Sequence, residues 1–150
     1  MAPLDQKSHE ILRVLGENGR ISNVELAERV HLSPSAVLRR VQEMERQGVI
    51  TGYRAQLGRE ALGRSFVAYL GVGLSAHVKT AQVAFETAMQ AAPEVVECHN
   101  TTGNIEYLLR VECADLKAYK VFHTDVLGTL PMVGSILTYV ILDSPKDERA

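Results

Sequence analysis

A short interruption, HLSPS at residues 31–35, separates two runs whose apolar residues recur at helical spacing. Ser33 is suited to cap a helix, and Pro34 then takes the first helical position, where its missing N–H costs nothing. The proline is therefore a start signal, and HLS is a tight turn. The chain must place two short helices one directly after the other at this point.

Three helices are predicted within residues 1–50. The segment LDQKSHEILRVL begins at a capping Asp5, Ser22 or Asn23 caps the short helix NVELAERV, and Ser33 caps the third helix. A tight link between the second and third of three short helices is the helix-turn-helix arrangement, in which the third helix lies in the major groove of DNA. Residues 29–59 carry six arginines against two glutamates, a local positive excess that suits such a partner.

The third helix has a core stripe and an opposite face. Val37, Val41 and Met44 recur at core spacing, so the helical period turns another set of side chains to solvent. The residues predicted to contact DNA are Ser33, Ser35, Arg39, Arg40, Gln42 and Arg46. Arginine's forked donors match guanine or phosphate, and Arg40, on the flank of this face, is expected to contact phosphate. The alternative is a solvated face on which these arginines pair with the helix's own glutamates.

The second half of the chain has a different pattern of apolar residues. Strand-like runs (SFVAYLGVGL, VVECHNT, YLLRVEC and VGSILTYVIL) alternate with the helical segments TAQVAFETAMQAA and DLKAYKVFHTDVLGTL. The order βαββαβ is that of a ferredoxin-like sandwich, one sheet with two helices on one face. The uncovered face carries Val67, Tyr69, Gly71 and Gly73, and we expect it to pack against another subunit.

These patterns predict an α+β chain with two domains. We expect a winged or ribbon-flanked helix-turn-helix domain at residues 1–50 and a βαββαβ domain at residues 65–150. Residues 51–64 would be a linker, with a short ribbon formed by VITGYRAQL after Gly48.

Several classes of protein are disfavoured. The longest uncharged apolar stretch, SFVAYLGVGLSA, is too short to span a bilayer, and the N-terminus lacks the apolar core of a signal peptide, so we expect a cytoplasmic protein with no membrane partner. Cys98 and Cys113 lack CxxC spacing, which fits a reducing compartment. The histidines are scattered, and no GxSxG, Walker, HExxH or GxGxxG motif occurs, so no catalytic site, metal or cofactor is predicted.

The chain resembles a known family over most of its length. The segments that carry the resemblance are LDQKSHEILRVL, NGRISNVELAERVHLSPSAVLRRVQEMERQGVITGY, PEVVECHNTTGNIEYLLRV and LPMVGSILTYVIL. In their order and spacing, from Leu4 to about Leu142, they are similar to the Lrp/AsnC family of bacterial and archaeal transcriptional regulators. The resemblance implies a C-terminal effector-binding domain, a homodimer that assembles to an octamer, and control by an amino acid. A two-fold dimer requires a roughly palindromic site on double-stranded DNA.

The turn HNTTGNIEYLL would then contribute to an effector pocket between subunits. A free amino acid needs donors for its carboxylate and an acceptor for its ammonium, and this loop supplies both. The predicted effector residues are Thr101, Thr102, Gly103, Asn104 and Glu106, with Leu116, Ser135 and Tyr139 as further lining positions. Glu106 stands where the family more often has aspartate, and we expect it to be an exposed acceptor for the ammonium. The alternative is a plain hairpin turn with Gly103 at positive φ.

The sequence therefore predicts a sequence-specific transcriptional regulator that responds to a small amino acid. One alternative is an architectural, chromatin-like protein that wraps DNA with little sequence preference and no effector. Another is a metabolite sensor that no longer binds DNA.

Overall fold

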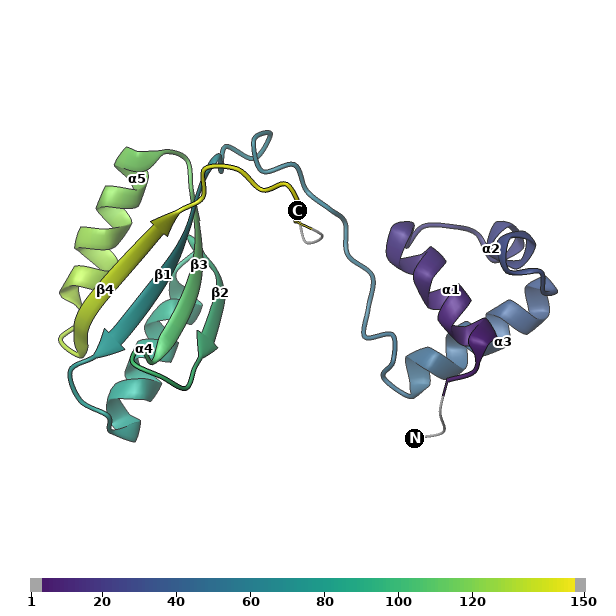
Figure 1. The fold of residues 1–150 in the computed structure, drawn as a ribbon, viewed down its shortest axis with the longest axis horizontal. Helices are drawn as coiled ribbons and strands as arrows, with labels where there is room; N and C mark the ends of the chain where they lie inside the picture. The colour runs from purple at the N-terminus through teal and green to yellow at the C-terminus, as the bar shows by residue number, and fades with distance from the viewer. Residues whose placement is uncertain (1–3, 148–150) are drawn as a thin grey trace. The chain divides into compact units, whose positions relative to one another are not determined.

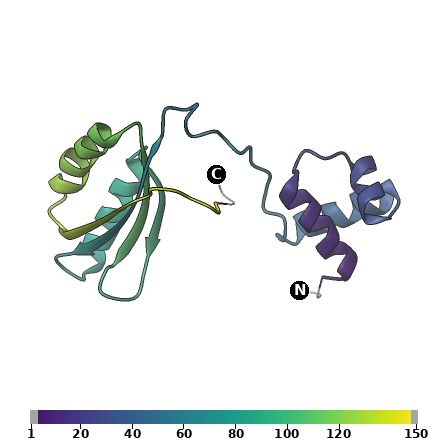
Figure 2. The ribbon, with the colours of Figure 1, turned by 45° about the horizontal axis from the view of Figure 1, so that its top comes forward.

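The structure is a computed structural model that describes residues 4–147. The chain divides into two compact units, one ending at Ala55 and one beginning at Gln56 (Figures 1 and 2). Each unit has its own apolar core. Among the described residues, no helix is long and apolar enough to cross a membrane.

The first unit consists of three helices: α1 (Gln6–Glu17), α2 (Asn23–Val30) and α3 (Pro34–Arg46). Each begins at a side-chain cap: Asp5 accepts from the Ser8 N–H, Ser22 from the Glu25 N–H, and Ser33 from the Ala36 N–H. The predicted N-caps are thus confirmed. Of the two candidates for the second helix, Ser22 is the cap. The core gathers the apolar stripes of all three helices: Ile11, Val14, Leu26, Ala27, Val30, Val37, Val41 and Met44.

The turn between α2 and α3 is closed by a left-handed residue. His31 has φ 55 and ψ 51, and its N–H reaches the carbonyls of Ala27 and Glu28. It is the one non-glycine residue with positive φ among those the structure describes. The left-handed region costs a residue with a Cβ roughly 1–2 kcal/mol, so the tight turn carries local strain.

The second unit is the predicted ferredoxin-like βαββαβ fold. Its strands lie in the order β2-β3-β1-β4, and all neighbours are antiparallel. After α5 the backbone continues as one π-helical and one 3-10 turn, Phe122–Val126 and Leu127–Thr129. The regular elements in chain order are β1 (Phe66–Leu74), α4 (Lys79–Ala91), β2 (Val95–Asn100), β3 (Tyr107–Cys113), α5 (Leu116–Val121) and β4 (Val133–Val140).

The two faces of the sheet differ in cover. Alternate residues of β1, such as Leu70 and Val72, are buried with Phe85 of α4 and Phe122 beyond α5. On the opposite face Tyr69 pairs with Tyr139, which is 57% exposed. The uncovered face predicted from the sequence is therefore present in the single chain. We call it the open face.

The ribbon predicted after Gly48 is not formed. Residues 49–64 contain no strand, and only a turn around residues 58–64 interrupts an extended course. A hairpin of two strands is at best marginal in water without a third strand or a helix to pack against. Among the described residues no strand pairs with this segment, so the single chain does not form the ribbon.

Candidate DNA-binding face and effector loop

The predicted DNA-binding residues lie together on one face of α3. Ser35, Arg39, Gln42 and Arg46 are exposed, as is the cap Ser33, while the stripe of Val37, Val41 and Met44 is buried. Ser33 and Ser35 also place their hydroxyl oxygens 3.2 Å apart at the start of the helix. The helical period therefore assigned this face correctly, although binding of DNA by it stays a prediction.

Two arginines of this face differ in their partners. The Arg46 guanidinium donates two hydrogen bonds to the Glu43 carboxylate, which also accepts from Gln47. These bonds lower the pKa of Glu43 to about 2. Arg39 makes no hydrogen bond or ion pair within the described chain. The alternative of internally paired arginines thus fits Arg46 and does not fit Arg39, whose donors are available.

Arg40 points to the first helix. Its Nη1 lies 2.8 Å from one carboxylate oxygen of Asp5 and donates to the other at 2.9 Å. The same nitrogen donates to the Ser8 hydroxyl at 3.2 Å. The expected binding of phosphate by Arg40 stays a prediction. Local sequence patterns did not reveal Asp5 as a partner, because it lies 35 positions earlier in the chain.

The predicted effector loop is closed by its own hydrogen bonds. The Thr101 N–H donates to the Glu106 carbonyl at 2.8 Å, and the Thr101 hydroxyl donates to the Ile105 carbonyl at 2.8 Å. Gly103 has a φ of 133, as the hairpin alternative requires. Thr102 and Asn104 are exposed at the tip. The loop is a hairpin, and its tip leaves polar groups available to a ligand.

Glu106 is fastened to the end of β1. Its carboxylate accepts from the Leu74 N–H at 2.8 Å, and His77 Nδ1 lies 2.5 Å from its other oxygen. The side chain is only 16% exposed, so the expectation of an exposed Glu106 was wrong. The cause is long-range, because β1 ends beside the loop. His77, which the sequence did not single out, belongs to the same cluster.

The remaining lining positions divide between the two faces of the sheet. Ser135 and Tyr139 lie on the open face, and a Cβ on Gly73 would come within 2.5 Å of the Ser135 hydroxyl and 3.5 Å of the Glu106 carboxylate. Ser135 therefore lies beside Glu106. Leu116 lies instead on α5, on the other face. Within one chain the structure separates Leu116 from the loop.

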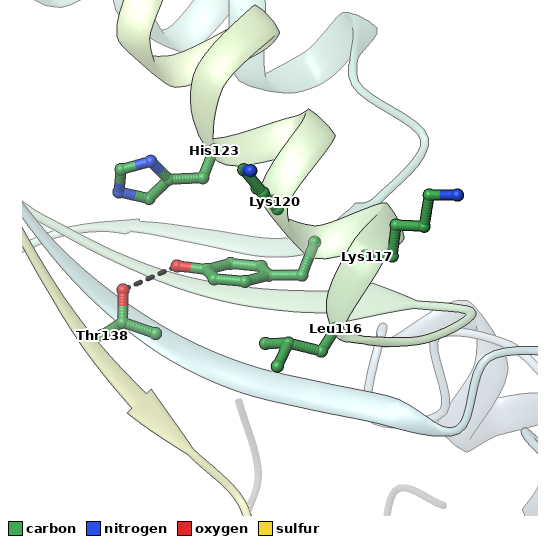
Figure 3. Close-up of a pocket in the computed structure, with 6 residues that line it drawn as sticks. Leu116, Lys117, Lys120, His123 and Thr138 are labelled. Atoms are coloured by element: carbon green, nitrogen blue, oxygen red, sulfur yellow. Dashed lines mark hydrogen bonds between the residues drawn. The ribbon is translucent and has the colours of Figure 1, made fainter.

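Leu116 borders an open groove of about 740 Å³ between α5 and β4 (Figure 3). In the groove the Tyr119 hydroxyl lies 2.6 Å from the Thr138 hydroxyl, and the Tyr119 ring packs edge-on against His123. Its other lining residues are Lys117 and Lys120.

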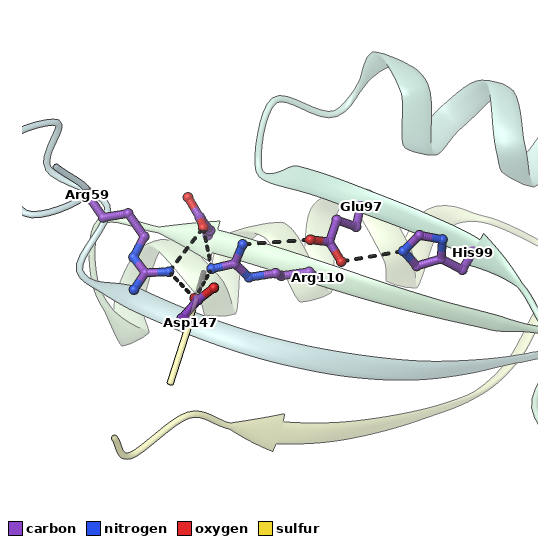
Figure 4. Close-up of polar contacts among 6 residues, drawn as sticks. Arg59, Glu97, His99, Arg110 and Asp147 are labelled. Carbon is purple, nitrogen blue, oxygen red and sulfur yellow. Dashed lines mark hydrogen bonds and ion pairs between the residues drawn. The ribbon is translucent and has the colours of Figure 1, made fainter. Parts of the chain in front are cut away.

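A charged network covers part of the open face (Figure 4). Arg110 is 6% exposed and lies 3.1 Å from Glu112 and 3.2 Å from Asp147 of the C-terminal segment. Asp147 also accepts from Arg59, at 3.1 Å, while Glu97 lies 3.8 Å from Arg110. The alternation Arg-Val-Glu in β3 was the available sequence signal, because two charges on one face of a buried strand need partners.

Two family models match the two units. Residues 4–51 match winged helix-turn-helix DNA-binding domains, and residues 67–150 match the Lrp/AsnC ligand binding domain. This chain belongs to the Lrp/AsnC family. It is therefore a transcriptional regulator with an N-terminal helix-turn-helix DNA-binding domain and a C-terminal amino-acid-binding domain.

Named relatives agree with the Lrp/AsnC assignment. The leucine-responsive regulatory protein of Escherichia coli is 39% identical over 146 residues, covering 97% of this chain and 89% of that protein. A transcriptional regulator of Neisseria meningitidis, solved as a complex with L-methionine, superposes with a TM-score of 0.92 at 36% identity, covering 97% of this chain and 94% of that one. AsnC of E. coli superposes with a TM-score of 0.87 at 27% identity, covering 97% of each chain.

Proposed function

We propose that this Lrp/AsnC regulator recognises specific sequences in double-stranded DNA with the exposed face of α3 and responds to a small amino acid. The proposal rests mainly on the exposure and lack of partners of Arg39. Its guanidinium is exposed, lies opposite the buried stripe and has no internal partner in the described chain. A forked donor of this kind pairs with guanine O6 and N7 in the major groove.

The other DNA contacts follow from position along α3. Gln42 and Arg46 continue the Arg39 face by one and two helical turns. Ser33 and Ser35 stand at the N-terminus, where the helix dipole and free N–H groups favour a phosphate. DNA must displace Glu43 to engage Arg46 fully, so we assign base contacts first to Arg39.

The effector site would be built around the Glu106 cluster. The Glu106 carboxylate accepts from the Leu74 N–H and lies beside His77, and it can accept further hydrogen bonds, which suits an ammonium group. Thr101, Thr102, Gly103 and Asn104 would supply donors for a carboxylate, and Ser135 lies beside Glu106. The relative bound to L-methionine and the relative named as leucine-responsive support an amino acid as the ligand. Leu116 and Tyr139 would join the site only where subunits meet.

We propose a homodimer that assembles further to an octamer. The open face offers Tyr139 and Leu137, which are 57% and 51% exposed, as apolar surface for a second copy. A two-fold dimer presents two α3 helices, so its DNA site is roughly palindromic, with half-sites about one helical turn or a multiple of it apart.

The test combines a ligand screen with a DNA titration. The purified chain is heated with each proteinogenic amino acid in turn, with and without DNA from upstream of its own gene. A true effector raises the melting temperature as its concentration rises, because it binds the folded state alone. Equal affinity for upstream and random DNA, with no stabilising amino acid, would support an architectural protein instead. Stabilisation without DNA binding would indicate a pure metabolite sensor.

A further inference from the structure

The first turn of α1 is attached to both helices of the helix-turn-helix. Asp5, the N-cap of α1, and Ser8, in its first turn, accept hydrogen bonds from Arg40 of α3. From the same turn the Lys7 ammonium donates to the carbonyl of Val30, the last residue of α2, at 2.8 Å. Polar contacts from one helical turn thus hold the end of α2 and the middle of α3.

Arg40 occupies a different environment from Arg39. Its side chain is 28% exposed, whereas Arg39 is exposed. The Ser8 side of the contact is buried, because Ser8 is only 6% exposed. The guanidinium is therefore held at the junction of α1 and α3, whereas Arg39 projects from the free face.

The charge of Arg40 is balanced where it lies. The Ser8 N–H and hydroxyl and the Arg40 guanidinium all lower the pKa of Asp5, which falls to about 2. The carboxylate is accordingly ionised at neutral pH, and its oxygen lies 2.8 Å from the guanidinium. An arginine paired in this way adds no net positive charge to the helix. It gives little attraction for a phosphate, and the nearby carboxylate repels one.

We propose that Arg40 is a positioning residue rather than a ligand of phosphate: through Asp5 and Ser8 it fixes the orientation of α3, and so of Arg39, on α1. The proposal rests on the proposed recognition of DNA by α3. It assigns to Asp5, an acidic residue, a part in DNA recognition that charge alone would not suggest. It also departs from the expectation that Arg40 contacts phosphate.

The two roles of Arg40 predict different salt behaviour. The slope of log affinity against log salt counts the phosphates that a protein neutralises, at about 0.9 per phosphate. If Arg40 neutralises a phosphate in each subunit, its replacement by a neutral residue lowers the slope. If Arg40 only positions α3, its replacement leaves the slope unchanged and reduces affinity only where base recognition depends on the exact placement of the helix.

The experiment uses the full chain and two duplexes of equal length, one from upstream of its own gene and one random. The variants are Arg40→Gln, Asp5→Asn and the double variant, with Arg39→Gln as the matched reference. Asparagine keeps a good N-cap, so Asp5→Asn removes the charge while α1 remains capped. Circular dichroism checks that each variant is folded. Affinity for both duplexes is then measured from about 50 to about 200 mM salt.

The proposal expects the two single variants to behave alike. Each should bind the upstream duplex about tenfold more weakly, as for one impaired base contact. Because each single variant leaves one charge of the ion pair without its partner, random-duplex affinity and salt slope are compared with wild type in the double variant, where both should be unchanged. The double variant should be no weaker than either single variant, since both remove the same ion pair. Arg39→Gln, which removes a proposed DNA contact itself, should lower either the salt slope or the preference for the upstream duplex.

Three results would overturn the proposal. The first is a reduced salt slope in Arg40→Gln with equal decreases in affinity on both duplexes. The second is tighter binding of the upstream duplex by Asp5→Asn, which would show that Asp5 only neutralises a cation that DNA could otherwise bind. The third is an equal decrease in affinity for both duplexes that is explained by a smaller folded fraction of the variant. That result would show a structural role alone. If the wild type binds neither duplex, the proposed function itself fails, and that failure is distinct from these three.

Discussion

The carboxylate of Glu106 accepts a hydrogen bond from the backbone N–H of Leu74, with 2.8 Å between oxygen and nitrogen. This bond joins the loop between β2 and β3 to the last residue of β1. A ligand that binds Glu106 would therefore bind a side chain that also holds the end of β1, one of the two inner strands of the sheet. The loop is a structural element as well as a candidate binding site.

Replacement of Glu106 should affect stability and effector binding together. Glu106→Ala leaves the Leu74 N–H without its acceptor, and we expect a decrease of about 1–3 kcal/mol in unfolding free energy, measured by urea denaturation. Glu106→Gln keeps an acceptor and should recover most of this decrease. Calorimetry with the amino acid found in the thermal screen should show Glu106→Ala weaker by about 1.5–3 kcal/mol and Glu106→Gln in between. Thr102→Ala, at the exposed tip, is the stability control. Wild-type stability in Glu106→Ala would contradict a stabilising role for this bond.

Removal of Arg39 should reduce discrimination between DNA sequences. Because its guanidinium has no internal partner in the described chain, Arg39→Ala removes a DNA contact without freeing a carboxylate. We expect about 1–3 kcal/mol weaker binding to the specific site, with relaxed base preference. Arg20→Ala, which removes an exposed arginine outside α3 that has no ion pair within the described chain, is the matched control. Gel-shift titrations at fixed salt measure both. Unchanged affinity and preference in Arg39→Ala would show that the α3 face is wrongly assigned.

The left-handed His31 offers a simple stabilising change. His31→Gly should raise the unfolding free energy of the first unit by up to about 1 kcal/mol, because relief of the Cβ strain exceeds the added entropy of the unfolded chain. Gly48, with φ 72 and open space around its Cα, supplies the opposite test. Gly48→Ala should destabilise by a similar amount. Thermal melts followed by circular dichroism compare the two, and a less stable His31→Gly would mean that the imidazole makes a stabilising contact.

The charged network on the open face should be sensitive to removal of its centre. Arg110→Ala would leave Glu112, which is 9% exposed, with Arg59 alone, whose Nη1 lies 3.8 Å from its carboxylate, and we expect a decrease of up to about 3–5 kcal/mol in unfolding free energy. Arg59→Ala should cost less, since Arg110 still pairs with Asp147. Urea unfolding of the full chain gives both values. Equal decreases would show that the two arginines share the network evenly.

The first unit should be sensitive to strong acid. The pKa of Asp5 falls from 3.8 to about 2 in the folded chain, mainly through the Ser8 N–H and hydroxyl and then through Arg40. A depressed carboxyl pKa stabilises the fold above the unfolded value, and this stabilisation disappears as pH falls through the folded value. Helix content should therefore become less stable between pH of about 4 and about 2. Asp5→Asn should flatten this dependence, as circular dichroism during urea unfolding at each pH can show.

Local signals predicted the first unit well. A cap acts within three residues and a helical stripe within two turns, so Asp5, Ser22 and Ser33 and the face of α3 could be read from the sequence. The βαββαβ order followed from the alternating periods in the same way. The missing ribbon shows the limit, since strand formation depends on a partner that a local pattern does not specify.

The polar partners that the sequence did not reveal have the same physical origin. Glu106 looked like an exposed turn residue, but the Leu74 N–H that binds it lies 32 positions earlier in the chain. Arg40 looked like a surface cation, but its partner Asp5 lies 35 positions earlier. Arg110 meets Asp147 across 37 positions. Each polar partner was fixed by tertiary packing, which single-sequence periodicity does not encode.

The absence of any helix or strand in residues 49–64, between two units that each have a core, bears on how such regulators diverge. A substitution on the exposed face of α3 changes no residue of the core that holds the sheet together. If the proposed function holds, selection can alter the DNA sequence that α3 recognises while the proposed effector site stays the same, and the reverse. A genome can duplicate one such gene and assign the copies to different promoters through a few changes in the first unit alone.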